Sequence, residues 1–305
     1  MRTTKYIYFA AAALMLASCS SEEPNAAQSG ELVAASFSAD IAGVKSRAYD
    51  TSWEQGDRIG ISCTSANGKT EYANMAYETA AADGIFAHVG GRPTGIFFQD
   101  TEDVTFSAYY PFSGTEGTAA AVLSGSTADQ SKQKSFDYLF AENVVGSRTN
   151  SAISFTGANA FNHCMTRLVI TVKVDPDAGF TADEVADGEF ALQGLQLNGT
   201  FDTATGKAEA TDEAADAAYW TIPAVAGTAA DTMVSSVILY PQNVSELKYR
   251  VIIDNEEYFA TITPALAAGT SYSYTVTVKK QGLEVPSATI NDGTSQDGGN
   301  VDAEM

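Results

Sequence analysis

The chain has 305 residues, of which 45% are hydrophobic and 18% are charged. This apolar content is enough to bury a core, which excludes global disorder, and the length fits two domains of roughly 100–200 residues each. The 17 Lys and Arg residues against 38 Asp and Glu residues give a net charge of -21, which excludes nucleic-acid binding through phosphate contacts and charge-driven docking on anionic lipids.

Residues 1–18 have the pattern of a secretion signal. Arg2 and Lys5 precede an uncharged apolar stretch over 6–16, which is shorter than the about 20 residues that span a bilayer. Leu-Ala-Ser-Cys at 16–19 resembles a bacterial lipobox, and an ordinary secretory signal that contains a cysteine is the alternative. The resemblance implies that Cys19 is acylated and anchors the mature chain to the outer membrane.

The residues after Cys19 are polar. Ser20-Ser21-Glu22-Glu23 resembles the surface-export signal of Bacteroidetes lipoproteins, and a plain polar tether is the alternative. We therefore assign 19–47 to a tether and a propeptide strand, and we expect the lipoprotein to be exposed at the cell surface.

From Leu32 onward, period-two alternation of apolar and polar side chains predicts strands. Helical signals are limited to short alanine-rich stretches. The clearest predicted strands cover 104–109, 168–174 and 272–279, and a hairpin is predicted from 248–253 and 258–262 around Asp254-Asn255-Glu256-Glu257. Many short strands separated by turns indicate an all-β sandwich or a pair of sandwiches.

The domain organisation is less clearly marked, because no Pro- or Ser-rich linker divides the chain. We predict an N-terminal sandwich over 48–160 and a C-terminal sandwich over 161–282, with the boundary near Phe161. The remaining residues, 283–305, end in a stretch over 291–300 that is almost wholly Gly, Asp, Ser, Thr, Asn and Gln. Such a composition favours a flexible tail.

The sequence contains no convincing catalytic or metal site, and no cofactor is predicted. His163 and Cys164 are adjacent, but neighbouring strand residues point to opposite faces and cannot form a nucleophile–base pair. The acidic clusters lie in turn-like segments, and the spacing of Asp292, Asp297, Asn300 and Asp302 does not match an EF-hand. We predict that the chain is not an enzyme.

Two further alternatives stay open from the residues alone. Cys63 and Cys164 form either one disulfide bridge or two small buried thiols. The triplets at 202–204 and 231–233, Asp-Thr-Ala and Asp-Thr-Met, resemble O-glycosylation acceptors of Bacteroidetes, and solvated turns are the alternative.

Five ordered segments together resemble the fimbrillin family of Bacteroidetes, the Mfa-like pilins of type V pili. They are Ser46-Arg47-Ala48 with Trp53-Glu54-Gln55-Gly56-Asp57-Arg58-Ile59-Gly60-Ile61, then Thr105–Pro111, Phe136–Ala141, Phe161–Leu168, and Leu266–Gly269 leading into Tyr272–Val278. The resemblance implies two tandem transthyretin-like or Ig-like antiparallel β-sandwich domains after a lipoprotein signal peptide.

The resemblance also implies a route of assembly. A protease cuts after an arginine near the N-terminus, the first strand leaves, and a strand of another subunit fills the emptied groove. Arg47-Ala48 stands where that cut would fall. The leaving strand would be Leu32–Val44, with Val33, Phe37 and Ile41 as groove fillers.

The donor strand implied by the same resemblance lies at the C-terminus, with Leu283, Val285, Ala288 and Ile290 as its plugs. Pro286 interrupts the alternation there. The implied partners are other pilin subunits, the outer membrane through the lipid anchor, and a ligand on a host or bacterial surface, with no nucleic acid. The implied location is the pilus and the outer membrane.

Two other functions remain as alternatives. The first is a monomeric surface lipoprotein that binds a glycan or a host protein, with Trp220 as a contact if it is exposed rather than in the core. The second is a glycoside hydrolase, which needs two convergent carboxylates; nothing in the sequence supplies them.

Overall fold

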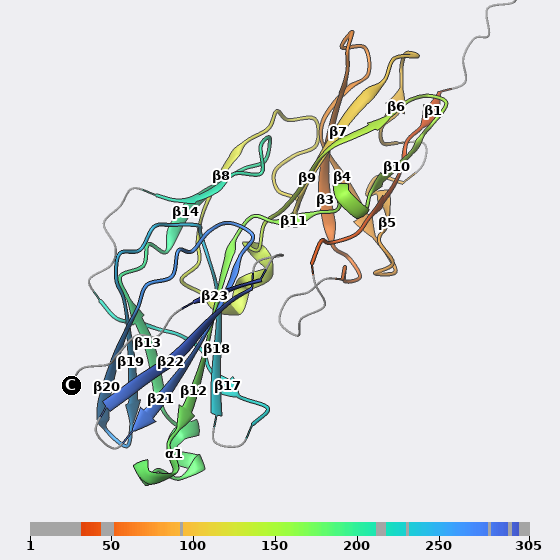
Figure 1. The fold of residues 1–305 in the computed structure, drawn as a ribbon. Helices are drawn as coiled ribbons and strands as arrows, with labels where there is room; N and C mark the ends of the chain where they lie inside the picture. Colours follow the sequence, from red (N-terminus) through yellow and green to blue (C-terminus); the bar gives the residue numbers. More distant parts are fainter. Residues whose placement is uncertain are drawn as a thin grey trace, which may run out of the picture. The chain divides into compact units, whose positions relative to one another are not determined.

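The computed structural model describes residues 32–43, 52–91, 94–211, 218–229 and 232–279 with their side chains, and 282–291 and 295–298 by their backbone. In this part of the chain, strands dominate and the helical elements are short (Figure 1). They are η1 (Gln130–Ser135), η2 (Gly157–Asn159), η3 (Pro176–Ala178) and α1 (Ala182–Ala186). The predicted all-β fold class is confirmed.

An eight-stranded sheet is built mainly from residues before Phe161. Its strands, in spatial order, are β10 (Ala152–Phe155), β2 (Ser36–Ala39), β5 (Ile85–His88), β4 (Glu71–Thr79), β3 (Arg58–Ser65), β7 (Val104–Tyr110), β9 (Leu139–Gly146) and β11 (Asn162–His163). A separate pair joins β1 (Val33–Ala34) to β6 (Phe97–Phe98). Buried side chains of these strands, among them Ile59, Phe98, Phe106 and Phe155, form the first core.

A six-stranded and a four-stranded sheet enclose the second core. The larger sheet contains β17 (Val225–Ala226), β18 (Thr232–Leu239), β12 (Thr166–Val174), β21 (Ser271–Lys279), β22 (Gly282–Asn291) and β23 (Ser295–Gly298); the smaller contains β16 (Trp220–Thr221), β13 (Glu189–Gln193), β19 (Leu247–Ile253) and β20 (Glu256–Ile262). Leu168 and Ile170 of β12 share one core with Tyr249 and Val251 of β19. Two sheets packed through their apolar faces make a β-sandwich.

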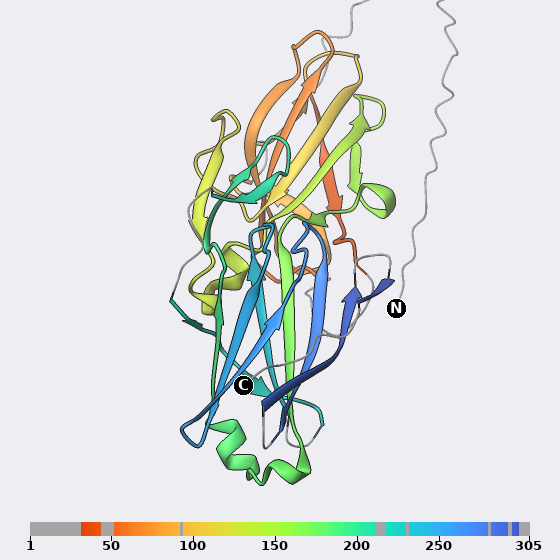
Figure 2. The same cartoon turned by 60° about the vertical axis from the view of Figure 1, so that its left-hand side comes forward.

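A third, smaller core is rich in aromatic rings. β14 (Asn198–Asp202) pairs with β8 (Val122–Ser126) and with β15 (Ala208–Ala210). Phe201 of β14 is fully buried, and its ring stacks on Tyr138 with centroids 4.3 Å apart. The same core includes Tyr109 of β7 and Tyr240, which follows β18. It therefore connects elements of the two larger sheets (Figure 2).

The strands predicted most clearly are present. β7, β12 and β21 contain the three predicted alternating segments. Buried side chains alternate with more exposed ones along β12 and β21, and along β7 as far as Ala108; Tyr109, which alternation places on the opposite face, is buried in the third core. β19 and β20 form the predicted hairpin. Asp254 and Asn255 at its tip have φ values of 49° and 65°, as a type I′ turn requires.

Three features differ from the sequence predictions. The sheets are mixed rather than purely antiparallel, since β2 runs parallel to β10 and β12 runs parallel to β21. Parallel neighbours need long crossovers, which alternation within one strand does not reveal. β23 places paired backbone inside the tail expected to be flexible. Helix α1 was not predicted, although Thr181 and Glu184 form a capping box at its start.

Asp100 organises a turn of the first sheet through its carboxylate. The carboxylate accepts hydrogen bonds from the Ser65 hydroxyl at 2.9 Å, from the amide and hydroxyl of Thr70 at 3.1 and 3.2 Å, and from the Glu102 amide at 2.9 Å. Desolvation raises the pKa of Asp100, but these hydrogen bonds outweigh it and hold that pKa below its usual value.

We expect an Asp100→Asn variant to be less stable than the wild type at pH 7. The folded pKa lies below the unfolded value of about 3.9, so the stabilisation is complete above that value and is lost as the pH falls through the folded pKa. The difference between the two proteins should therefore shrink below about pH 4. Urea midpoints from pH 2 to 7 measure it; a difference independent of pH contradicts the role of the charge.

Candidate functional site

The predicted leaving strand, Leu32–Val44, contains β2 of the structure. β2 pairs in parallel with β10 and antiparallel with β5, so it occupies an interior position of the eight-stranded sheet (Figure 1). β10 and β5 have no pairing with each other in the described residues. One short strand near the N-terminus therefore fills the gap between two strands that come much later in the chain.

The side chains of β2 complete the first core. Phe37 is 3% exposed, and its ring lies 4.7 Å from Tyr77 and 5.7 Å from Phe106, between centroids. Val33 and Ile41, the two other predicted groove fillers, are partly buried against the same core. Ala39, at 1% exposure, is a further inward residue. It was missed because alanine carries a weak hydrophobic signal, although it stands two residues from Phe37.

Backbone hydrogen bonds hold the segment along its length. They join the amide of Ala35 to Ile96, that of Ser36 to Ser151, that of Ala39 to Gly84, that of Asp40 to Phe155 and that of Ala42 to Phe161, at 2.7–3.0 Å. Backbone pairing carries no side-chain specificity. A different strand with suitable inward residues can make the same bonds.

Trp53, which follows the segment in the sequence, contacts it through Ala39. Its side chain is 5% exposed and belongs to the first core. The indole Nε1–H donates to the carbonyl oxygen of Ala39 at 2.6 Å. The ring packs edge-on against Phe86, Tyr110 and Phe161, with centroids 5.1–5.6 Å apart.

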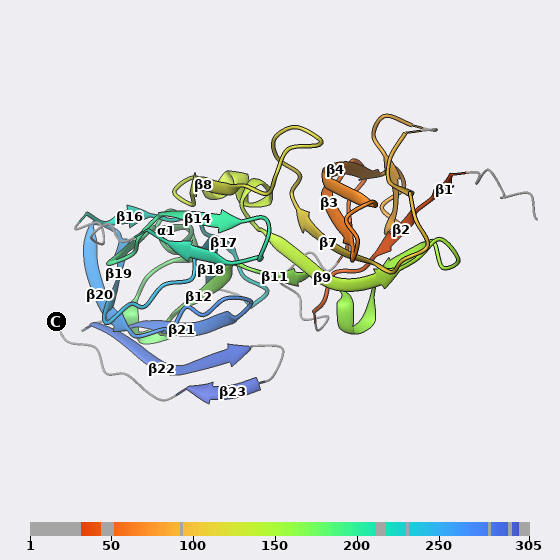
Figure 3. The ribbon, with the colours of Figure 1, turned by 90° about the horizontal axis from the view of Figure 1, so that it is seen from above.

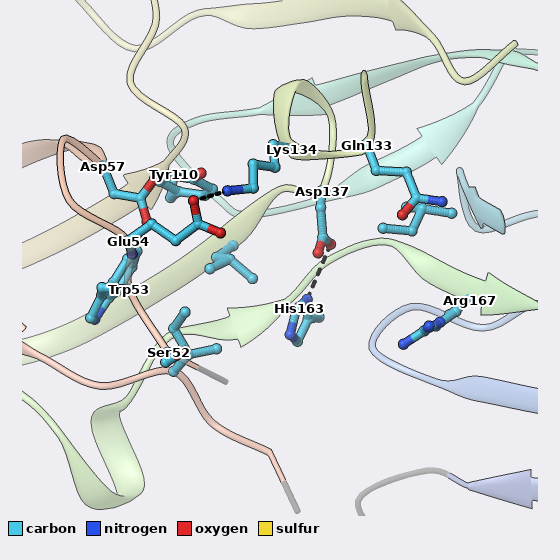
Figure 4. A pocket seen from close by; sticks show the side chains of 13 residues that line it. Ser52, Trp53, Glu54, Asp57, Tyr110, Gln133, Lys134, Asp137, His163 and Arg167 are labelled. Atoms are coloured by element: carbon cyan, nitrogen blue, oxygen red, sulfur yellow. Dashed lines mark hydrogen bonds and ion pairs between the residues drawn. The ribbon is translucent and has the colours of Figure 1, made fainter. Parts of the chain in front are cut away.

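A pocket of about 410 Å³ lies next to Trp53 (Figure 4). Four of its ionisable lining residues pair with each other: Lys134 with Glu54, and Asp137 with His163 Nδ1 at 3.1 Å. Asp57 accepts a hydrogen bond from the Tyr110 hydroxyl, and Arg167 donates to the Ser236 hydroxyl. Ile41 forms part of the wall. Ion pairs formed within the protein are typical of a structural junction. They give no reason to call this pocket a catalytic site.

The predicted donor segment forms β22. β22 pairs antiparallel with β21, and β23 pairs with β22 (Figure 3). The register shifts between Thr275 and Thr277, whose partners are Ser287 and Glu284. Pro286 lies in that interval, where a missing amide interrupts a ladder. The side chains of Leu283, Val285, Ala288 and Ile290 lie outside the described part of the structure.

The other predicted processing residues also lie outside it. Cys19, Arg47 and Ala48 belong to segments that the structure does not describe, and so do the acidic residues at 212–216. Acylation and cleavage therefore remain predictions.

Neither described cysteine is placed for chemistry. Cys63 and Cys164 are free and buried, so the disulfide alternative is contradicted. Desolvation raises the pKa of each thiol to about 12, which keeps both protonated at neutral pH. The Cys164 thiol donates to the carbonyl of Asn162, whereas His163 pairs with Asp137. The predicted separation of the two side chains is confirmed.

The remaining predicted side chains are in structural positions. Thr203 is 9% exposed and hydrogen-bonds both the amide and the carbonyl of Ala121. Thr232 is 8% exposed and donates to Ala229. Such buried hydroxyls favour the turn interpretation over O-glycosylation of the folded chain. Trp220 is partly buried, packs against the second core and donates to Ala128, so its ring is not a free surface contact.

The described residues contain neither a metal-binding cluster nor a membrane-spanning helix. No group of three or more His, Cys, Asp or Glu side chains is arranged to hold a metal ion. No helix among the same residues is long and apolar enough to cross a membrane.

Comparison with known proteins decides the family. A family model described as fimbrillin-like matches residues 46–292. The chain belongs to the fimbrillin-like family. The match covers the five segments from Ser46 to Val278 on which the predicted resemblance rests, and that prediction is confirmed.

Individual relatives of this fimbrillin-like chain agree. "Putative fimbrium subunit Fim1C" of Bacteroides uniformis is 28% identical over 318 residues, which cover 94% of each chain. The crystal structure of a "putative cell adhesion protein" from Bacteroides ovatus is 27% identical, covers 88% of this chain and 100% of its own, and has a TM-score of 0.72. A protein of the same description from Bacteroides uniformis has a TM-score of 0.67 at 23% identity, covering 86% of this chain and 98% of its own. The relatives are fimbrial and adhesion proteins rather than enzymes.

Proposed function

We propose that this fimbrillin-like chain is a structural or adhesive subunit of a cell-surface pilus. It is exported as a lipoprotein acylated at Cys19, cut between Arg47 and Ala48, and assembled by strand exchange. The observation that carries the proposal is the position of β2, which alone fills the gap between β5 and β10. Family membership and the fimbrial and adhesion relatives support the pilus role.

Loss of β2 creates a site of defined chemistry. The facing edges of β5 and β10 lose their backbone partners, and the space of the Phe37 ring opens between Tyr77 and Phe106. Unpaired strand edges next to an apolar cleft bind an added strand through backbone hydrogen bonds and inward side chains. The partner is then the C-terminal segment of another subunit, with Leu283, Val285, Ala288 and Ile290 as plugs.

One observation favours a second function, a monomeric surface lipoprotein that binds a glycan or a host protein. β22 pairs with β21 of its own chain, and it is not available to another subunit for as long as it stays paired there. In that function Arg47 stays uncut and the acylated Cys19 is retained.

The N-terminus of the protein recovered from the surface of the producing bacterium distinguishes the two. We expect mass spectrometry to find Ala48 at the new N-terminus, and high-mass assemblies in the surface fraction. An Arg47→Ala chain should keep its N-terminal strand and remain unassembled. Lys45→Ala, a neighbouring loss of charge, should be processed like the wild type. An acylated Cys19 followed by an intact Arg47 in the wild type would contradict assembly by strand exchange through this groove.

A further inference from the structure

Trp53 binds the proposed leaving strand and belongs to the part of the chain that would remain after cleavage. It follows Arg47 in sequence, and the rings that fix it belong to Phe86, Tyr110 and Phe161. All three also follow the proposed cut. The orientation of the indole N–H is therefore set by parts of the chain that remain after β2 departs.

The N–H meets the strand at a single residue, Ala39. The Ala39 carbonyl accepts the indole N–H at 2.6 Å, and the Ala39 amide donates to the Gly84 carbonyl at 2.8 Å. Gly84 has a φ of +73°, and a Cβ on it would lie 2.4 Å from the Ala39 oxygen. The backbone of β2 thus passes Gly84 at a distance that only glycine permits.

The position of Ala39 also restricts the size of the side chain. Ala39 is 1% exposed, and its neighbours belong to the first core. At this point the groove takes both the carbonyl and the amide hydrogen of one strand residue, next to Trp53 and Gly84, together with a small inward side chain. Proline is excluded because it has no amide hydrogen.

We propose that Trp53 and Gly84 form a register-setting site for the strand that occupies the groove. The inference rests on the proposed strand exchange and adds which residue of the incoming strand must lie there. An occupant that covers the Trp53 indole N–H and the Gly84 carbonyl without hydrogen-bonding them buries two unpaired polar groups, which is costly. Registers that do not satisfy both groups are disfavoured.

The occupant to which this site points is the segment 282–291 of a second copy. Its sequence, Gly-Leu-Glu-Val-Pro-Ser-Ala-Thr-Ile-Asn, contains one alanine, Ala288. Ala288-Thr289-Ile290 repeats the order of Ala39-Asp40-Ile41, a small residue, a polar one and an isoleucine. Ala288 therefore takes the position of Ala39 on Trp53.

The experiment measures strand replacement in the cut protein. The full chain is cut after Arg47 with an arginine-specific protease, mass spectrometry verifies the single cut, and the N-terminal piece carries a fluorescent label. Synthetic peptides corresponding to 282–291 compete for the groove, and release of the labelled piece gives their relative affinities. A second set of peptides corresponds to 32–44, the chain's own strand.

Matched substitutions test the register. In the 282–291 peptide, Ala288→Leu should weaken binding by on the order of tenfold or more, whereas the adjacent Thr289→Leu should change it less than about twofold. In the 32–44 peptide, Ala39→Leu and Asp40→Leu should differ in the same way. Trp53→Phe in the protein keeps the aromatic ring and removes the N–H, and it should weaken every unsubstituted peptide on the order of tenfold.

The outcomes separate the inference from the proposed function. If Ala288→Leu and Ala39→Leu bind as well as their controls, the register-setting site is overturned. If the 32–44 peptides obey the rule and no 282–291 peptide binds, the site stands and the donor assignment fails. Should Trp53→Phe not fold, the peptide substitutions against the unsubstituted protein decide the result alone.

Discussion

A Phe37→Ala chain is expected to lose about 3–5 kcal/mol of unfolding free energy, as large aromatic-to-alanine changes in cores do. Phe37 is 3% exposed and lies against the rings of Tyr77, Phe106 and Phe155. No other side chain of β2 is large, so the cavity left by the substitution has nothing nearby on the same strand to fill it. Equilibrium urea unfolding measures the loss.

The substitution should also make β2 detach from the sheet more often. Amide hydrogen exchange of 35–42 should accelerate more than that of β3 and β7, because the strand keeps its backbone bonds but loses its main apolar contact. Ser36→Ala is the matched control: Ser36 is on the same strand but exposed, and its removal should cost less than about 0.5 kcal/mol. A Phe37→Ala loss as small as that of the control would mean that the first core does not depend on β2.

Phe201→Ala is expected to have a similarly large effect, about 3–5 kcal/mol, but of a different kind. Phe201 is fully buried and stacked on Tyr138, and the core around it contains residues from β7 and from the chain after β18. Removing its ring should weaken the contact between the first and second cores more than it weakens the packing within either core. The two should then unfold at separate denaturant concentrations.

The two tryptophans provide the readout for this prediction. Trp53 belongs to the first core and Trp220 packs against the second, so single-tryptophan versions report the cores one at a time. In the parent chain both signals should change together, and in Phe201→Ala they should separate. Phe259→Ala is the matched control, because it makes the same substitution at a phenylalanine that is 40% exposed. It should leave the two transitions coincident. Coincident transitions in Phe201→Ala would contradict a connecting role for the third core.

The sequence predicted strands where one face of a strand is buried. Buried and exposed residues alternate along β12 and β21, and the turn at Asp254-Asn255 marks the β19–β20 hairpin of the facing sheet. Alternation does not identify the partner of a strand. The parallel pairing of β2 with β10 and the pairing of β8 with β14 join residues far apart in the chain, and nothing local in either strand encodes it.

The candidate site was predictable only in part. Phe37 was identified through the resemblance to the fimbrillin family, which implies a leaving strand over Leu32–Val44 with Phe37 as one of its groove fillers. Ala39 and Gly84 were not, since a small residue becomes important only when another backbone passes close to it. Helix α1 was missed because five residues are too few for a period of 3.6 to be visible. Its capping box was the available signal.

Ser38 and Ser154, which face each other across β2 and β10, are 116 positions apart in the chain. During synthesis, β2 therefore cannot pair with strands on both of its edges until β10 has been made. In the intact chain the strand is covalently joined to the rest of the protein, and such a connection gives it an effective concentration in roughly the millimolar range. In the proposed assembly, a cut after Arg47 would remove that advantage while leaving the described contacts of β2 in place. The first strand and the donor strand of another subunit would then compete as separate molecules, and the concentration of neighbouring subunits would set how often the donor strand succeeds.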